Sequence, residues 1–286
     1  MTRRLILTAD DFGMSMEVNE AVEEAHRDGV LTCASLVVAG DAAEDAIRRA
    51  KRMPTLGVGL HLALYGAPAQ LSGTRAPEIA PDGVNLGDRP VRTGVAIMIV
   101  PSIRAQARRE ITAQFQAWRK TGLPLGHLDG HWHCHQHPAL LTMAIGLGKP
   151  LGLRAVRIPH ETYGLSRRIA GGQHSAARLG EAVSHYPLAL WMRRRVRGAG
   201  LRTNDWFFGK TDAGAMDAGL LVQTIRYLPP GTTEIGLHPA IRPWRGRHAP
   251  PVGWRADEEL QALKEPTVRE LIRTSDVTLC RWADLP

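Results

Sequence analysis

Histidine and aspartate occupy every second position of one short segment, and this spacing is the strongest chemical signal in the sequence. The segment reads HLDGHWHCHQH, and its ionisable side chains are those of His127, Asp129, His131, His133, His135 and His137. While the chain stays extended, a period of two places all of them on one face. Such a row of imidazoles is costly to bury unless a metal ion, carboxylates or water satisfies it. The pattern indicates a metal or acid–base site, with a His-rich surface segment as the alternative.

Two adjacent carboxylates, Asp10 and Asp11, directly follow an apolar run at residues 4–9. A strand alternates its side chains, but the chain turns where a strand ends, so both carboxylates can reach one site. One of them could then bind a metal ion while the other acts as a base. The alternative is that Asp11 caps the following turn and Asp10 is only exposed.

Two further histidines belong to apolar runs. His61 lies inside GVGLHL at 57–62, and His238 ends a run just before Pro239, which stops strand pairing. Taken alone, His61 fits a hydrogen-bonded core residue and His238 fits a capped strand end. Together with the two features above, however, carboxylates or imidazoles terminate four separate strands. These ends converge in a barrel, and that convergence favours an active site.

Short apolar runs alternate with helical patterns, which is typical of βα units around a parallel sheet. The predicted strands are 4–9, 31–38, 57–62, 125–129, 155–158, 205–208, 234–237 and 277–280. The predicted helices are 16–27, 42–52, 103–121, 138–148, 189–198, 215–227 and 257–273. We therefore expect a single α/β domain over residues 1–286, a deformed (β/α) barrel. Irregular segments at 64–100, a long loop or lid, and at 160–187 should form insertions over the face that carries the carboxyl ends of the strands.

The composition narrows the classes of protein that remain. The chain has 286 residues, is 44% hydrophobic, and carries 36 Lys and Arg against 28 Asp and Glu, a formal charge of +8. The excess suggests an anionic partner. Few aromatic residues and no helix-turn-helix or zinc-finger spacing argue against nucleic acid. Three scattered cysteines, the lack of a long apolar stretch and a short N-terminal apolar run predict a cytoplasmic protein, with contact to the inner face of a membrane as an option.

The motifs ADDFG near the N-terminus, GLHL near residue 60, HLDGHWHCH at 127–135 and LHPA at 237–240 resemble those of the YdjC-like carbohydrate deacetylases. The resemblance covers nearly the whole chain. It implies a deformed (β/α) barrel and removal of the acetyl group from N-acetylglucosamine units. Glycine stands at position 130, where the family pattern has serine.

The resemblance also implies roles for individual residues. Asp11, His61 and His131 would bind one divalent metal ion, zinc or magnesium. Asp10 would be the general base, and His238 would assist the tetrahedral intermediate or the leaving amine. The residues that match motif positions of less definite role, in substrate binding or in support of the ligands, are His127, Asp129, His133 and Arg157.

Longer segments at 18–32, 154–161 and 214–240 resemble the hopanoid-biosynthesis-associated deacetylases within this family. That subgroup often has asparagine at the position of Asp129. The implied substrate is a hopanoid lipid that carries N-acetylglucosamine. A soluble chitooligosaccharide deacetylase and, in another class, a non-haem iron oxygenase are the alternatives, since two histidines and one carboxylate also hold iron.

One segment bears on the membrane option. Residues 188–197 read LALWMRRRVR, an apolar stretch with a tryptophan that runs into an arginine cluster. It fits either a membrane-surface contact or a helix with a solvated basic end. The sequence does not predict an oligomeric state.

Overall fold

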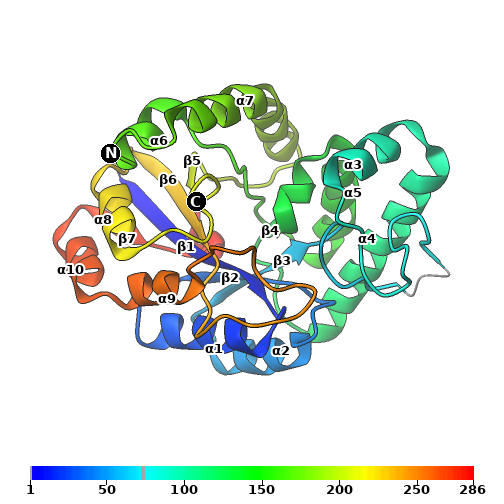
Figure 1. The fold of residues 1–286 in the computed structure, drawn as a ribbon, viewed down its shortest axis with the longest axis horizontal. Helices are drawn as coiled ribbons and strands as arrows, with labels where there is room; N and C mark the ends of the chain where they lie inside the picture. Colours follow the sequence, from blue (N-terminus) through cyan, green and yellow to red (C-terminus); the bar gives the residue numbers. More distant parts are fainter. Residues whose placement is uncertain (1, 72–74) are drawn as a thin grey trace.

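The structure is a computed structural model that describes residues 2–71 and 75–286. Its centre is a parallel sheet in the order β4-β3-β2-β1-β6-β5, with β7 paired to the first residues of β1 (Figure 1). The strands are β1 (Arg3–Phe12), β2 (Cys33–Leu36), β3 (Gly57–Leu62), β4 (Leu128–Gly130), β5 (Trp206–Phe208), β6 (Gly231–Leu237) and β7 (Val277–Leu279). The sheet curls into a half-barrel, which confirms the predicted deformed (β/α) barrel.

Helices surround the curled sheet on its outer side (Figure 1). They are α1 (Met16–Arg27), α2 (Ala43–Arg52), α3 (Pro90–Ile99), α4 (Pro101–Thr121), α5 (Pro138–Gly148), α6 (Tyr163–Ile169), α7 (Ser175–Gly198), α8 (Ala218–Arg226), α9 (Ala256–Lys264) and α10 (Pro266–Thr274). Short 3₁₀ turns are η1 (His131–Gln136), η2 (Lys149–Leu151) and η3 (Trp282–Asp284). In the described ranges, none of these helices combines the length and apolar character needed to cross a bilayer.

Among the described residues, isolated pairings close the gap between β4 and β5. Leu128 bridges Val156, and Ala155 bridges Arg202 just before β5. The predicted strand at 155–158 is therefore wrong as a strand. Pro159, which has no N–H for a ladder, ends the segment after these few residues. The segment nevertheless places Arg157 in the middle of the half-barrel.

The predicted insertions contain more helix than expected. Helix α3 begins at Pro90 inside the 64–100 segment, of which residues 72–74 lie outside the described part. Helices α6 and α7 occupy most of 160–187. Proline is well tolerated in the first turn of a helix, so Pro90 starts α3 rather than preventing it. For the same reason the predicted helix 257–273 is two helices, with Pro266 opening the second.

The basic segment at 188–197 is the second half of α7. Trp191 packs against the core, and Arg193 donates to the backbone carbonyls of Asn204 and Asp205 at 2.6 and 2.7 Å. Arg194 and Arg195 are exposed. Both interpretations of the segment, a membrane-surface contact and a solvated basic helix end, are compatible with this exposure.

Close packing between β3 and β4 depends on a glycine. A Cβ added to Gly59 would lie 2.4 Å from two ring atoms of His127, which is itself stacked on Trp282 at 5.5 Å between ring centroids. His127 is fully buried and cannot swing away. Glycine at position 59 therefore leaves the space that the His127 ring occupies, and the two strands can pair around it.

We predict that Gly59→Ala lowers the free energy of unfolding by about 2–3 kcal/mol, because overpacking a rigid core displaces backbone or rings. Urea denaturation measures the change. The matched control is Gly146→Ala in α5, where an added Cβ meets nothing within 4 Å and helix propensity should raise stability by up to about 1 kcal/mol. Equal stabilities for the two variants would contradict this packing.

Candidate active site

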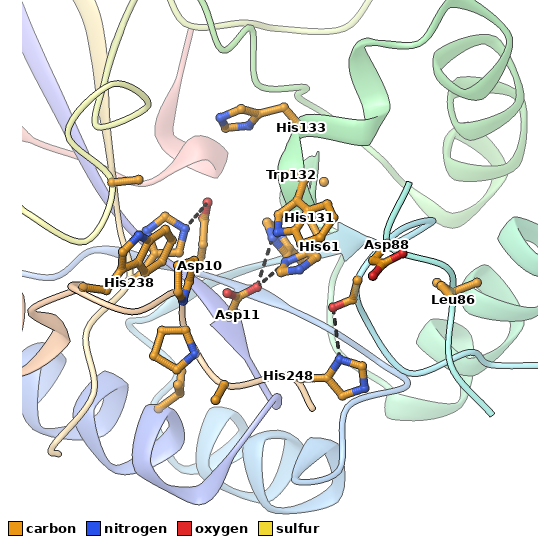
Figure 2. A pocket seen from close by; sticks show the side chains of 18 of the residues that line it. Asp10, Asp11, His61, Leu86, Asp88, His131, Trp132, His133, His238 and His248 are labelled. Carbon is orange, nitrogen blue, oxygen red and sulfur yellow. Dashed lines mark hydrogen bonds and ion pairs between the residues drawn. The ribbon is translucent and has the colours of Figure 1, made fainter. Parts of the chain in front are cut away.

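The chemical residues found in the sequence gather at the carboxyl ends of the strands, around a cavity of about 370 Å³. Figure 2 shows Asp11 between two groups, with His61 and His131 on one side and Asp10 and His238 on the other. His133 also lines the cavity. The predicted convergence of strand ends is therefore present.

A break in strand β1 explains how two adjacent aspartates reach one cavity. The pairing of β1 with β2 shifts register between Ala9 and Phe12, and Asp11 has a φ of 62°. In an undisturbed strand, successive side chains would point to opposite faces. The irregularity turns both carboxylates inward. Asn19 fixes the turn, because its side chain accepts from the Gly13 N–H at 2.8 Å and donates to the Ala42 carbonyl at 2.9 Å.

Asp11, His61 and His131 form a compact donor set. Asp11 Oδ1 lies 2.7 Å from His131 Nδ1 and 3.5 Å from His61 Nε2, and one donor atom from each residue lies within 4.8 Å of the others. Burial alone would raise the pKa of Asp11, but the neighbouring His131 and His61 hold it below its usual range. The carboxylate is therefore ionised at any ordinary pH.

A buried carboxylate orients His61. Asp129 Oδ1 accepts from His61 Nδ1 at 2.8 Å, which leaves Nε2 to point at Asp11. Burial alone would lower the pKa of His61, but Asp129, Asp10 and Asp11 raise it to about 9. A carboxylate that holds the outer nitrogen of a metal-ligating histidine is a common arrangement in metal sites.

The donor set fits a divalent cation on two observations. His131 Nε2 is buried and has no hydrogen-bond partner, so one imidazole of the set is left unsatisfied. Asp11 Oδ1 and His61 Nε2 face each other at 3.5 Å, close to the roughly 3.4 Å between two ligands of a tetrahedral zinc ion. With His61 bonded to Asp129 through its Nδ1–H, its Nε2 lone pair faces the carboxylate of Asp11 unless a proton occupies it. A cation or a proton must lie between them.

Arg157 is the centre of the charged network behind the cavity. Its guanidinium is fully buried and donates to both oxygens of Asp10 at 2.7 and 2.8 Å and to both oxygens of Glu234 at 2.8 and 3.0 Å. Its Nη2 also lies 2.9 Å from Asp129 Oδ2. These carboxylates raise the pKa of Arg157 well above its usual range despite the opposing effect of burial.

His238 stands at the other side of Asp10. Its Nε2 lies 4.0 Å from Asp10 Oδ2 (Figure 2). Its ring packs against Trp254 at 4.6 Å between centroids. The backbone N–H of His238 donates to Glu259 Oε2 at 2.5 Å. Asp10 thus lies between the guanidinium of Arg157 and the imidazole of His238.

The prediction that the His-rich segment keeps one face beyond Gly130 is wrong. Strand β4 ends at Gly130, and the chain turns into η1 with positive φ at Trp132 and His133. His131 and His133 therefore line the cavity by way of a turn. His135 instead donates from Nε2 to the Arg157 carbonyl at 3.0 Å, and His137 donates to the Gly94 carbonyl at 3.0 Å.

His127 stays behind the site and does not line the cavity. Its Nε2 lies 3.0 Å from the Ser35 hydroxyl, which donates to Asp129 Oδ2 at 2.6 Å. Since that hydroxyl proton is used on Asp129, the oxygen accepts from His127. His127 and Asp129 therefore support His61 from behind.

Sequence reasoning missed several residues of the site. Glu234 is fully buried on β6 and Ser35 on β2, and both bind the network of Arg157 and Asp129. A glutamate inside the apolar run TEIGL was a usable signal, because a lone buried carboxylate needs a cationic partner. Ser35 gave no comparable signal in CASL.

The cavity wall includes three tryptophans and a long segment after β6. Trp132, Trp244 and Trp254 line it together with Lys210. The segment at 241–255, orange in Figure 1, reaches across to the loop that follows β3. His248 makes the connection, with Nδ1 3.1 Å from the Gly66 carbonyl and Nε2 2.7 Å from Asn85 Oδ1.

Fold and cavity together define a (β/α)-barrel protein with a carboxylate–imidazole site at the carboxyl ends of its strands, where enzymes of this architecture have their active sites. The sequence profile described as "YdjC-like protein" matches residues 4–274. The chain therefore belongs to the YdjC-like family.

Several of the proteins similar to this chain are carbohydrate deacetylases. A carbohydrate deacetylase of Mus musculus is 32% identical over 99% of this chain and 94% of its own length, and one of Homo sapiens is 31% identical over 99% and 91%. One of Brevibacillus brevis is 39% identical, but the alignment spans just over half of each chain, 51% and 56%. A solved structure from Enterococcus faecalis V583, provisionally named a cellobiose-phosphate cleavage protein, has a TM-score of 0.69 at 21% identity, over 99% and 98% of the two chains. That last likeness shows the fold.

Buried neutral histidines make the fold acid-sensitive. Burial lowers the pKa of His127 to about 4 and that of His135 to about 4. Both values lie below the pKa of about 6.5 in an unfolded chain, so unfolding takes up protons once the pH falls below that value. We predict that each histidine reduces the free energy of unfolding by roughly 2 kcal/mol between pH 7 and pH 5. Urea denaturation at the two pH values measures the loss.

A His127→Gln variant provides the control. Its loss of stability between the two pH values should be smaller than that of the parent protein by roughly 2 kcal/mol, the contribution of His127 itself, whatever its absolute stability. Equal stability of the parent protein at pH 7 and pH 5 would contradict the prediction that buried neutral histidines destabilise the fold in acid.

Proposed function

We propose that the protein is a metal-dependent hydrolase that removes the acetyl group from an N-acetylglucosamine unit. The observation that carries the proposal is the gathering of Asp11, His61 and His131 donor atoms within 4.8 Å, beside an Asp10 held by Arg157. Membership of a family with carbohydrate deacetylases similar to nearly the whole chain supports the substrate class.

Asp11, His61 and His131 would hold the metal ion. Such an ion supplies Lewis-acid polarisation of the acetyl carbonyl and of the attacking water. Two imidazoles and one carboxylate suit zinc, whereas magnesium prefers oxygen ligands. We propose a divalent ion, zinc or magnesium. Asp129 and His127 would keep His61 in the tautomer that presents Nε2 to the site.

Asp10 acts as the general base in this proposal. Both of its oxygens accept from Arg157, so the carboxylate is held in one orientation, with lone pairs left to accept a proton from water. Water adds to the acetyl carbon as Asp10 takes its proton. His238, 4.0 Å from Asp10, then protonates the sugar nitrogen as the C–N bond breaks, releasing acetate and the free amine.

The cavity suits a sugar ring. Trp132, Trp244 and Trp254 offer flat apolar faces, while His133 and Lys210 offer polar groups along the same wall. Among acetylated sugars we propose the N-acetylglucosaminyl hopanoid, in hopanoid biosynthesis, on the longer sequence segments that resemble that subgroup. A chitooligosaccharide is the alternative substrate. Contact of the exposed Arg194 and Arg195 with an anionic membrane would accompany the lipid substrate.

We predict that Asp10→Asn lowers kcat for acetate release by about 10³-fold, because the amide cannot accept the proton, and that the variant keeps its bound metal. Acetate is followed with N-acetylglucosaminyl hopanoid and with diacetylchitobiose, and metal is measured by mass spectrometry on the same samples. Oxygen uptake is recorded in parallel, since an iron oxygenase would consume oxygen.

The matched control is Asp276→Asn, which removes an exposed carboxylate paired with Arg3 and should leave kcat within about twofold. Loss of metal from Asp10→Asn would place Asp10 among the ligands. Unchanged acetate release would remove it from the chemistry.

A further inference from the structure

Helix α3 turns large apolar side chains away from the core. Val91 is 81% exposed, Val95 55%, Met98 48% and Ile99 72%. Its sequence, PVRTGVAIMI, has Arg92 as its charged residue. A surface helix usually places polar residues on its outer face. Exposed apolar side chains grouped in this way mark a binding site for an apolar partner, which can be a protein surface, a membrane or a ligand.

The helix is fixed in position against the His-rich turn. Ile97 is fully buried, and His137 Nε2 donates to the Gly94 carbonyl at 3.0 Å. The packing is close at this point: a Cβ added to Gly94 would make van der Waals contact with the Tyr65 hydroxyl at 3.5 Å and the His137 ring at 3.6 Å. Between α3 and the turn lies a groove of about 350 Å³.

The groove adjoins the active-site cavity. Trp132 and His133 line both spaces. Trp132 is 50% exposed and its indole is held from the other side, since an added Cβ on Gly66 would lie 2.6 Å from it. A substrate whose sugar occupies the cavity can therefore extend across Trp132 into the groove.

The α3 wall of the groove selects against charged and strongly polar occupants. Among the described residues that form it, none is Asp, Glu, Lys or Arg, and the α3 wall presents Val91, Val95 and Met98. Sugar hydroxyls removed from water need hydrogen-bond partners, and these three side chains offer none. The polar side chains that line the groove, such as those of Tyr65, His133 and His137, lie outside α3. An aliphatic chain needs no such partners.

We propose that this groove binds an apolar aglycone joined to the acetylated sugar, so that the substrate is a glycolipid or alkyl glycoside. The inference rests on the proposed function, because it takes the sugar to occupy the cavity. Val95 and Met98 then determine specificity by contact with the aglycone. A second sugar unit in the groove is the competing occupant.

The test compares kcat/KM for acetate release from methyl, butyl and octyl N-acetylglucosaminides and from diacetylchitobiose, below the concentration at which octyl glycosides form micelles. Each methylene that is fully removed from water favours binding roughly fourfold. For a partly covered chain we expect kcat/KM of the octyl glycoside to exceed that of the methyl glycoside at least about tenfold. Affinities for the same glycosides are measured by calorimetry.

Val95→Asp should reduce the octyl-to-methyl ratio to about one, because the aliphatic chain cannot desolvate a carboxylate. Ile99→Asp is the matched control, since Ile99 is also apolar and exposed on the same helix but does not line the groove. It should keep the ratio of the parent protein.

A ratio near one in the parent protein, equal losses in the two variants, or higher kcat/KM for diacetylchitobiose than for the octyl glycoside would overturn the inference. Absence of acetate release from every glycoside would contradict the proposed function instead. In that event the calorimetric octyl-to-methyl ratio, and its loss in Val95→Asp, still decides whether the groove binds the chain.

Discussion

The fully buried guanidinium of Arg157 is the interaction on which the rest of the site depends. It binds Asp10 on β1 and Glu234 on β6 through both oxygens of each, and contacts Asp129 on β4. These strands are not all neighbours in the sheet, so the guanidinium joins them across the inside of the half-barrel. Loss of one partner in a buried network of this kind typically costs about 3–5 kcal/mol, because the remaining charges stay buried without compensation.

The charge balance of this network leads directly to the cation site. Three carboxyl groups, those of Asp10, Asp129 and Glu234, contact one permanently charged guanidinium. Asp11 adds a further carboxylate beside them in the cavity. The excess negative charge raises the pKa of His61 and favours a divalent cation where Asp11 and the two imidazoles meet. The contact with Arg157 therefore gives Asp10 a different role from that of the adjacent Asp11. Asp10 is bound to the guanidinium, while Asp11, turned by the break in β1, remains available to a cation.

The sequence predicted the parts of the site that local patterns encode. Asp11 and His61 lie at the ends of apolar runs, and parallel strands bring such ends together. Alternation could not predict the positive φ angles at Trp132 and His133, which follow from the way η1 leaves β4. It therefore failed to separate His131, in the cavity, from His135, which holds the Arg157 backbone. Family resemblance selected His131 where periodicity could not.

Longer-range features were out of reach for a different reason. The role of Glu234 depends on an arginine 77 positions away, and the cavity wall depends on His248 reaching a loop 182 positions earlier. Helix α3 was not predicted, because the segment around it is rich in proline and glycine. Pro90 is nevertheless the residue at which the helix starts. The contacts of Glu234 and His248 form only when the half-barrel closes. A short stretch of sequence therefore cannot predict them.

The central claim is that a divalent cation at Asp11, His61 and His131 enables hydrolysis of the sugar acetamide. Titration of the purified protein with a chelator, with bound metal and acetate release measured on the same samples, tests it most directly. The account predicts that both fall together as one equivalent of metal per chain is removed, and that both return when zinc or magnesium is restored. Full acetate release from metal-free protein would contradict it.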